Sequence, residues 1–88
     1  MFYYNYVLLC KKDSDKSEFY IGITSDLKKR VQQHKNRCVK STKGFDSVEL
    51  VYYEACKNKT DARHRENQLK TGFGRGYLKR RLENFVQI

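Results

Sequence analysis

The chain has 88 residues, of which 39% are hydrophobic, and a formal net charge of +9. A chain of this length has room for one hydrophobic core, so we expect a single domain over residues 1–88. It contains no apolar run near the roughly 18 residues of a membrane span and no signal peptide at its start, which indicates a cytoplasmic protein without a membrane-bound segment.

The positive charge is concentrated in two segments. Residues 57–81 contain nine Lys or Arg against two acidic residues, and residues 25–43 contain seven against one. The first 24 residues carry three charges of each sign and are neutral. Protein surfaces that serve only solubility mix the two signs, so this distribution favours a polyanionic partner along one side of the domain, and nucleic acid before anionic lipid.

The three cysteines indicate neither a disulfide framework nor a zinc site. Cys10, Cys38 and Cys56 are odd in number and widely spaced, with no C-x-x-C pair. We interpret them as reduced thiols that pack as small apolar groups.

Two strands are predicted at the start of the chain. Residues 2–10 and 19–24 are rich in aromatic and β-branched side chains, and residues 11–18 between them form a polar loop of turn formers. The strand period of two puts Tyr6 on one face of the first strand and Tyr20 on one face of the second. If the strands pair, the two hydroxyls converge.

Gly22 lies on the same face of the second strand as Tyr20. Because glycine has no side chain, we expect a gap beside the tyrosines where a backbone or a ligand approaches closely.

A helix is predicted over residues 26–37, capped by Thr24 or Ser25, with Leu27 and Val31 on its buried side. Charged or polar residues beside this apolar side need a partner.

Arg30 and His34 stand one turn apart next to the apolar side of this helix. One interpretation is that the Arg30 stem merely covers the margin of the core. The other is a site in which Arg30 grips a phosphate while His34 hydrogen-bonds a phosphate or a nucleophile.

The second half of the chain predicts one more strand and two helices. Residues 38–46 form a basic loop, residues 48–55 alternate as a third strand, and Thr60 caps a helix over residues 61–71. The order ββαβαα predicts an α/β (α+β) fold with a three-stranded antiparallel sheet flanked by helices.

A glycine-rich segment follows the second predicted helix. We interpret Gly72, Gly74 and Gly76 as a helix end with a flexible hinge, and phosphate contacts from Arg75 and the backbone as the alternative. The last helix then covers residues 77–85, with an apolar stripe of Leu78, Leu82 and Phe85.

Glu66 occupies the middle of an apolar stripe. Ala62, Glu66 and Leu69 stand at i, i+4 and i+7 of the second predicted helix. A buried carboxylate is costly unless it is paired or binds a metal. Either an ion pair with Arg30 or a bound Mg²⁺ satisfies this requirement.

Taken together, these segments resemble the GIY-YIG nuclease family, in the small single-domain branch similar to the catalytic domain of the bacterial excision-repair endonuclease subunit. The resemblance covers essentially the whole chain. The matching segments are Tyr4-Asn5-Tyr6, Tyr20-Ile21-Gly22-Ile23-Thr24, Ser25-Asp26-Leu27-Lys28-Lys29-Arg30 with His34, Leu50-Val51-Tyr52-Tyr53-Glu54 and Arg65-Glu66-Asn67.

The resemblance implies a divalent-metal-dependent endonuclease acting on DNA, with a role in DNA repair. Tyr6 and Tyr20 match the two motif tyrosines, one of which orients or deprotonates the attacking water. Arg30 matches the arginine that stabilises the phosphoryl oxygens, and His34 matches an auxiliary histidine. Glu66 matches the sole protein ligand of a Mg²⁺ or Mn²⁺ ion that keeps most of its water.

The chain departs from the family pattern at two places. Tyr4 and Asn5 replace Gly and Ile in the first motif, and an asparagine about a dozen residues after the metal ligand is missing, with Lys79 or Arg75 as its candidate replacement. A catalytically weak or inactive nucleic-acid-binding module, or a subunit active only with a protein partner, is therefore the alternative function. We expect a monomer or weak dimer.

The basic segments supply the predicted nucleic-acid contacts. These are Lys28, Lys29, Lys40, Lys43, Arg63, Lys70, Arg75, Lys79 and Arg80.

Overall fold

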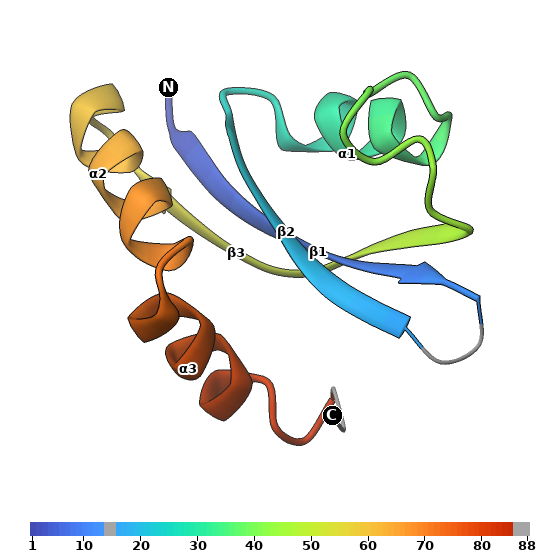
Figure 1. Ribbon diagram of the computed structural model, residues 1–88. Helices are drawn as coiled ribbons and strands as arrows, with labels where there is room; N and C mark the ends of the chain where they lie inside the picture. Colours follow the sequence, from blue (N-terminus) through green and yellow to red (C-terminus); the bar gives the residue numbers. More distant parts are fainter. Residues whose placement is uncertain (14–15, 86–88) are drawn as a thin grey trace.

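The computed structural model describes residues 1–13 and 16–85, and these form a three-stranded sheet with a helix layer on each face (Figure 1). The elements in chain order are β1 (Tyr3–Lys12), β2 (Lys16–Thr24), α1 (Leu27–Lys35), β3 (Ser47–Cys56), α2 (Lys59–Leu69) and α3 (Gly72–Arg81). The predicted order ββαβαα is confirmed. None of the helices in the described part of the chain has the length and apolarity that a bilayer crossing requires.

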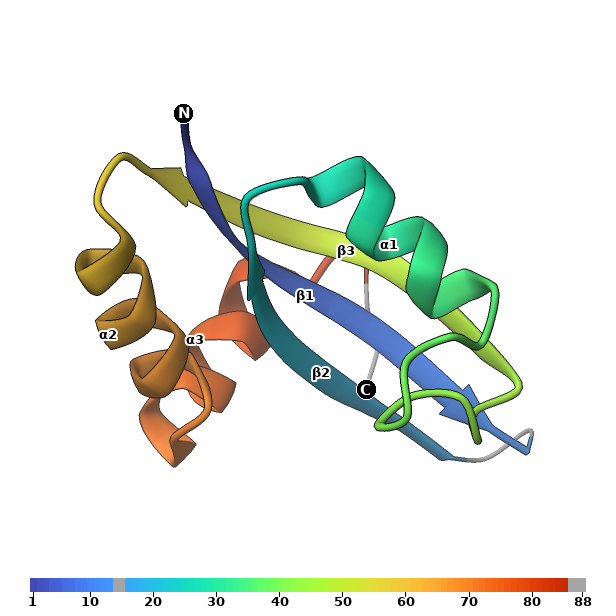
Figure 2. The ribbon, with the colours of Figure 1, turned by 90° about the horizontal axis from the view of Figure 1, so that it is seen from above.

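β1 is the central strand and pairs antiparallel with both neighbours, so the sheet order is β2-β1-β3. Being central explains its composition, because both of its faces are covered and residues 5–10 are all buried. Figure 2 shows the three strands side by side, with α1 running alongside β3.

The two faces of β1 feed two separate cores. Tyr6, Leu8 and Cys10 face α1, where Leu27 and Val31 cover them. The opposite face carries a second core of buried residues contributed by the sheet, α2 and α3: Val7, Ile21, Leu69 and Leu78. The alternation predicted for the first strand is therefore confirmed, and Cys10 packs as a small apolar group whose pKa burial raises to about 11.

The predicted loop over residues 11–18 is wrong, although residues 14–15 lie outside the described residues. β1 continues to Lys12 and β2 already begins at Lys16, with Lys11 opposite Ser17 in the register. Ladder hydrogen bonds use only backbone groups, so polar side chains at the end of a twisted hairpin do not interrupt pairing. Asp13 takes the left-handed conformation at φ 58°, as the chain turns.

The helix boundaries differ from the prediction at both amino ends. Asp26 is the N-cap of α1 and accepts a hydrogen bond from the backbone N–H of Lys29 at 3.1 Å. Asn58, and not Thr60, caps α2 by accepting from the backbone N–H of Asp61. Both are short acceptors of the type preferred at this position.

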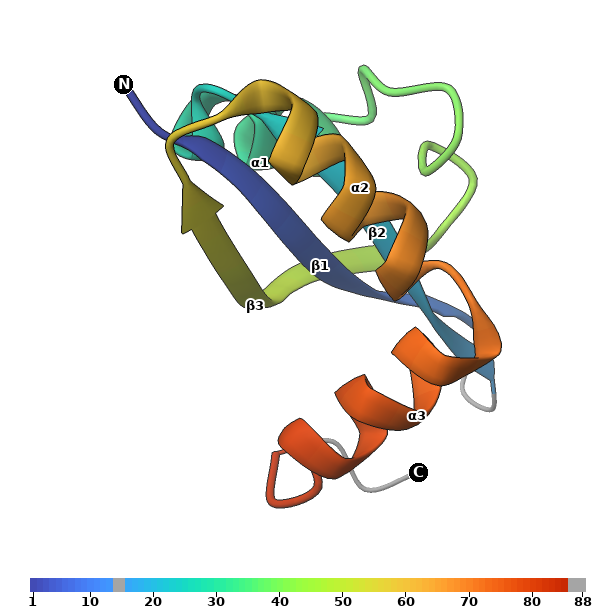
Figure 3. The same ribbon diagram turned by 90° about the vertical axis from the view of Figure 1, so that its left-hand side faces the viewer.

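The predicted break between the second and third helices is confirmed, but it lies at residues 70–71, before the glycines. Thr71 caps α3, which begins at Gly72 and contains all three glycines (Figure 3). A Cβ on Gly74 would lie 2.3 Å from the carbonyl oxygen of Leu69, so glycine here permits a tight corner between α2 and α3. α3 ends at Arg81, earlier than predicted. Phe85 is therefore outside the helix and exposed, and it does not continue the apolar stripe.

Candidate active site

Tyr6 lies directly over Gly22. The two residues are opposite each other in the β1–β2 register, and a Cβ on Gly22 would come within 2.4 Å of the Tyr6 ring and hydroxyl. The gap predicted at this glycine therefore exists, and the Tyr6 ring fills it. Glycine at this position fixes the height of the tyrosine above the sheet.

The Tyr6 hydroxyl is the centre of a buried hydrogen-bond network. Tyr6 is 1% exposed, and its oxygen lies 2.8 Å from Nε2 of His34 and accepts a hydrogen bond from Nε of Arg30 at 3.3 Å. Burial raises the pKa of the Tyr6 hydroxyl, and the hydrogen bond from Arg30 opposes that rise. The positive charge thus makes the tyrosine a better acid than its burial alone would allow.

His34 is an internal residue of this network. It is 1% exposed, and its second ring nitrogen, Nδ1, lies 2.7 Å from Oγ1 of Thr42. Burial and the nearby charge of Arg30 lower the pKa of His34, so it is neutral near pH 7. Both ring nitrogens contact protein groups, and the contact present at Nε2 is with the tyrosine hydroxyl.

Tyr20 reaches the same site from β2. Its ring centroid lies 6.3 Å from that of Tyr6 and 5.1 Å from that of His34. The predicted convergence of the two tyrosines is confirmed. Unlike Tyr6, Tyr20 is only half-buried, and its hydroxyl accepts a 3.4 Å hydrogen bond from Ser41 at the surface.

Arg30 is half-buried and retains an unpaired charge. Its guanidinium donates to the Tyr6 hydroxyl and, at 3.1 Å, to Oε1 of Gln33, both of them neutral groups. Among the residues that the structure describes, no carboxylate pairs with Arg30. The ion pair with Glu66 that the sequence offered as an alternative is therefore not formed, and the charge is available to an anionic ligand.

Glu66 approaches the site from α2, on the other side of the sheet. Its neighbours in the stripe, Ala62 and Leu69, are fully buried, while the Glu66 side chain is 15% exposed and 3.3 Å from Nζ of Lys70. Its charge is the smallest of the causes that act on the pKa of Tyr6, where it adds to the rise that burial produces.

Glu66 is the predicted metal ligand. Within residues 1–13 and 16–85 no group of three or more His, Cys, Asp or Glu side chains gathers as a metal-ligand cluster. A lone, mostly buried carboxylate with one exposed lysine partner suits a hard cation that keeps most of its water, such as Mg²⁺, and does not suit zinc.

A basic cleft adjoins the tyrosines along the free edge of β2. It has a volume of about 550 Å³, and its walls include Tyr20 from the strand with Lys70, Arg75 and Lys79 from the α2–α3 corner. Lys70 connects this cleft to Glu66 through the ion pair. Three of the predicted nucleic-acid-binding residues are thus brought together beside the candidate site.

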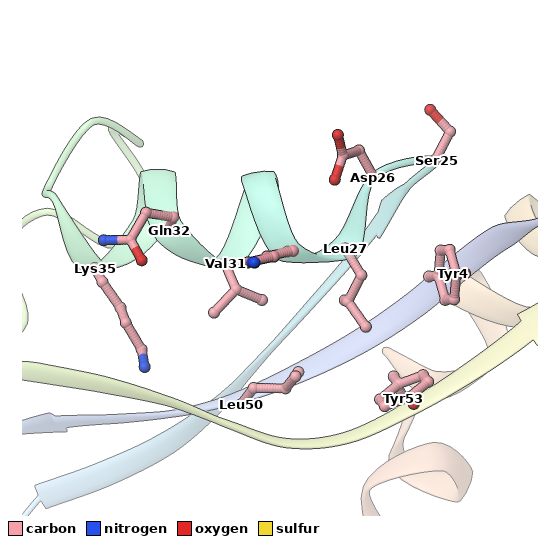
Figure 4. Close-up of a pocket in the computed structure, with 10 residues that line it drawn as sticks. Tyr4, Ser25, Asp26, Leu27, Val31, Gln32, Lys35, Leu50 and Tyr53 are labelled. Atoms are coloured by element: carbon pink, nitrogen blue, oxygen red, sulfur yellow. The ribbon is translucent and has the colours of Figure 1, made fainter.

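A second groove lies on the other side of the domain, between α1 and β3 (Figure 4). It has a volume of about 660 Å³ and an apolar floor that includes Leu27, Leu50 and Tyr53, with Lys28 in its lining. Lys28 is therefore separated from the basic cleft.

All nine predicted nucleic-acid-binding residues are exposed: Lys28, Lys29, Lys40, Lys43, Arg63, Lys70, Arg75, Lys79 and Arg80. The sequence did not single out Thr42, Ser41 or Gln33, which hold His34, Tyr20 and Arg30 in place. A Ser or Thr in a basic loop carries no signal of its own, because the contact depends on how the loop folds back.

A tightly bonded group on the far face fixes α2 against the sheet. Arg65 donates two hydrogen bonds to Glu54 on β3, at 2.8 Å each, and Tyr52 donates to the same carboxylate. These bonds hold the pKa of Glu54 below its ordinary value, through Arg65 first. Because Arg65 precedes Glu66, the same bonds set the position of the candidate metal ligand.

Comparisons with known proteins agree with this architecture. A family model described as the GIY-YIG catalytic domain matches residues 2–82. A UPF0213 protein of Clostridium perfringens is 43% identical over 68 residues, which are 76% of this chain and 69% of the relative. UPF0213 proteins of Staphylococcus saprophyticus and Haloquadratum walsbyi are 37% and 31% identical, over 78% and 80% of this chain and 80% and 75% of their own lengths. No solved structure matches the chain.

Proposed function

The chain belongs to the GIY-YIG catalytic-domain family, and from this premise we propose that it is a divalent-metal-dependent endonuclease that hydrolyses phosphodiester bonds in DNA. The observation that carries the proposal is the unpaired guanidinium of Arg30 bonded to the Tyr6 hydroxyl at 3.3 Å. A phosphate that binds this guanidinium would lie next to the Tyr6 oxygen. The phosphorus to be attacked and a candidate general base would then be close together.

Tyr6 is the candidate base for the attacking water. A free tyrosine has a pKa near 10, and burial raises that of Tyr6, so it needs help to ionise near neutral pH. Arg30 supplies a stabilising charge for the phenolate, and the imidazole of His34, 2.8 Å away, is placed to take the proton. Tyr20, which is closer to solvent, orients the water or the phosphate.

Glu66 is the candidate metal ligand, for Mg²⁺ or Mn²⁺. Carboxylate oxygens are ligands that such an ion prefers. With Glu66 as the only protein ligand among the described residues, the other coordination positions would be left to water and phosphate oxygens. The bound ion would neutralise charge that develops on the phosphoryl and leaving oxygens.

The basic cleft beside Tyr20 supports binding of the sugar–phosphate backbone. Lys70, Arg75 and Lys79 line it, and with a net charge of +9 the protein would bind DNA largely through phosphates. Arg75 and Lys79 are also the groups near the position where many family members carry an asparagine. We propose that the DNA strand next to the cleaved bond passes through this cleft.

Arg30→Ala tests the proposal, with Arg81→Ala as a matched control because Arg81 is exposed and lies outside the candidate site. We expect Arg30→Ala to lose about 10²–10³-fold in single-turnover cleavage, as for removal of a group that stabilises the transition state, with little change in DNA affinity. Equal cleavage rates for the two variants would show that Arg30 takes no part in the cleavage reaction.

The second candidate function is a DNA-binding module that does not cleave, alone or without a protein partner. The missing asparagine and the charge distribution favour it. Its signature would be tight, salt-sensitive DNA binding by the wild type with no cleavage in Mg²⁺ or Mn²⁺. Cleavage that returns only in cell extract would indicate the partner-dependent form.

A further inference from the structure

The loop between α1 and β3 has a defined internal structure. The backbone N–H groups of Thr42 and Lys43 both donate to the carbonyl of Val39, and that of Phe45 donates to the carbonyl of Thr42. Val39 and Thr42 are buried, whereas Lys40 and Lys43 are exposed. The loop therefore presents basic side chains outward and one hydroxyl inward. Its backbone lies beside α1 (Figure 2).

The inward hydroxyl contacts the candidate catalytic network. Oγ1 of Thr42 lies 2.7 Å from Nδ1 of His34, and both residues are 1% exposed. Thr42 is the only partner of Nδ1 among the described residues, and Nε2 faces the Tyr6 hydroxyl at 2.8 Å. A continuous chain of hydrogen bonds thus runs from the loop to the phenol.

Whether these hydrogen bonds can carry a proton away from Tyr6 depends on the tautomer of His34. A neutral imidazole has one N–H and one lone pair. If Nδ1 carries the proton and donates to Thr42, Nε2 can accept the proton of Tyr6. If Nε2 carries the proton, His34 can only donate to Tyr6 and cannot act as its base.

Resting on the proposed nuclease function, we propose that Thr42 is a positioning residue. It holds the His34 ring with Nε2 toward Tyr6 and supplies the oxygen that the Nδ1–H needs when His34 accepts the proton of Tyr6. In the step itself the Tyr6 O–H bond breaks and the proton moves to Nε2. The phenolate oxygen keeps the electron pair, and both ring N–H groups of the resulting imidazolium are bonded, one to Tyr6 and one to Thr42. Without the Thr42 oxygen, the imidazolium would leave a buried N–H unpaired.

The same loop also reaches the second tyrosine, because Ser41 donates to the Tyr20 hydroxyl at 3.4 Å. Ser41 and Thr42 lie between the exposed Lys40 and Lys43. The segment predicted to contact nucleic acid therefore also orders the groups around both phenols.

The direct test is ¹⁵N NMR of the two histidines in the wild type, Thr42→Val and Thr42→Ser, without metal or DNA. Valine keeps the shape of threonine but lacks the oxygen, and serine retains it. The groups that face this network are Tyr6 from β1, Tyr20 from β2, Arg30 from α1 and the distant charge of Glu66 from α2. All are unchanged in the three proteins, so a difference reports on the hydroxyl.

We expect the Nδ1–H tautomer of His34 in the wild type and in Thr42→Ser. In Thr42→Val we expect a changed Nδ1 signal and a further lowered pKa of His34, because the N–H that faced the Thr42 oxygen loses its acceptor and the imidazolium becomes less stable. His64, which is exposed on α2, serves as an internal reference and should not change. The Nε2–H tautomer in the wild type would overturn the proposal without any substitution, as would identical His34 signals in all three proteins.

Cleavage rates separate this inference from the proposed function. Loss of a group that orients a catalytic side chain costs about 10–100-fold, so we expect this loss for Thr42→Val with DNA affinity unchanged and recovery in Thr42→Ser. A changed His34 signal in Thr42→Val with no loss of cleavage rate would refute the catalytic role of Thr42. If the wild type itself does not cleave, the proposed function fails, and the catalytic part of this inference fails with it.

Discussion

Gly22→Ala should disable the site by displacing Tyr6. The new Cβ would lie 2.4 Å from both Cζ and the hydroxyl oxygen of Tyr6 and 2.8 Å from Cε1. Non-bonded carbon atoms prefer separations of about 3.5–4.0 Å, so the ring has to move by roughly 1 Å.

Tyr6 cannot make this movement without losing its partners. It is 1% exposed, its hydroxyl is bonded to His34 and Arg30, and its ring lies against Tyr20. A displacement of about 1 Å in a catalytic group costs about 10²-fold in rate. Overpacking of a filled core costs about 1–3 kcal/mol of stability, which a domain can survive.

The assay is single-turnover DNA cleavage in Mg²⁺ together with urea unfolding. Gly44→Ala is the matched control, because a Cβ there meets nothing within 4 Å and the residue does not have a positive φ. We expect the control to cleave like the wild type. A folded Gly22→Ala protein that cleaves at the wild-type rate would refute the placement of Tyr6 at the centre of the site.

Three further predictions concern the rest of the molecule. Glu54→Gln should cost about 1 kcal/mol of unfolding free energy at pH 7. The bonds from Arg65 lower the pKa of Glu54, so their contribution to the free energy of unfolding is present above the ordinary Glu pKa of about 4.3 and is lost as the pH falls further. In urea unfolding, the stability difference between wild type and Glu54→Gln should therefore be smaller at pH 3 than at pH 7. An equal difference at the two pH values would contradict this. Gly74→Ala should lower the stability by at least about 1–3 kcal/mol, because its Cβ meets the end of α2. Gly72→Ala, whose Cβ lies in open space, should raise the stability by about 0.5–1 kcal/mol. Thermal unfolding that ranks the two variants the other way would refute the tight corner. Lys79→Ala should reduce the slope of log DNA affinity against log salt by about one, and an unchanged slope would mean that the basic cleft does not bind phosphate.

The sequence predicted the fold where periodicity and composition act locally. The period of two along β1 placed Tyr6 on the face that α1 covers, and the motif spacing placed Arg30 beside it. The helical period likewise put Glu66 between buried Ala62 and Leu69. These positions follow from backbone geometry alone.

Other features depend on contacts that no local pattern encodes. Gly74 indicated a helix break, but it permits close approach of two helices, which only the tertiary structure shows. Thr42 joins the site because its loop folds back onto α1, and Gly22 accommodates a side chain from the neighbouring strand. The sequence therefore predicted where the candidate site residues lie along their strands and helices, but not their hydrogen-bond partners.

The measurement that tests the central claim most directly is DNA cleavage by the purified wild type and Glu66→Ala in Mg²⁺, Mn²⁺ and EDTA. Glu49→Ala is the matched control, because Glu49 is an exposed carboxylate on β3 outside the site. We expect wild-type and Glu49→Ala proteins to cleave only with a metal ion, and Glu66→Ala to bind DNA without cleaving it. Cleavage in EDTA, or full cleavage by Glu66→Ala, would contradict a metal-dependent nuclease built on this carboxylate.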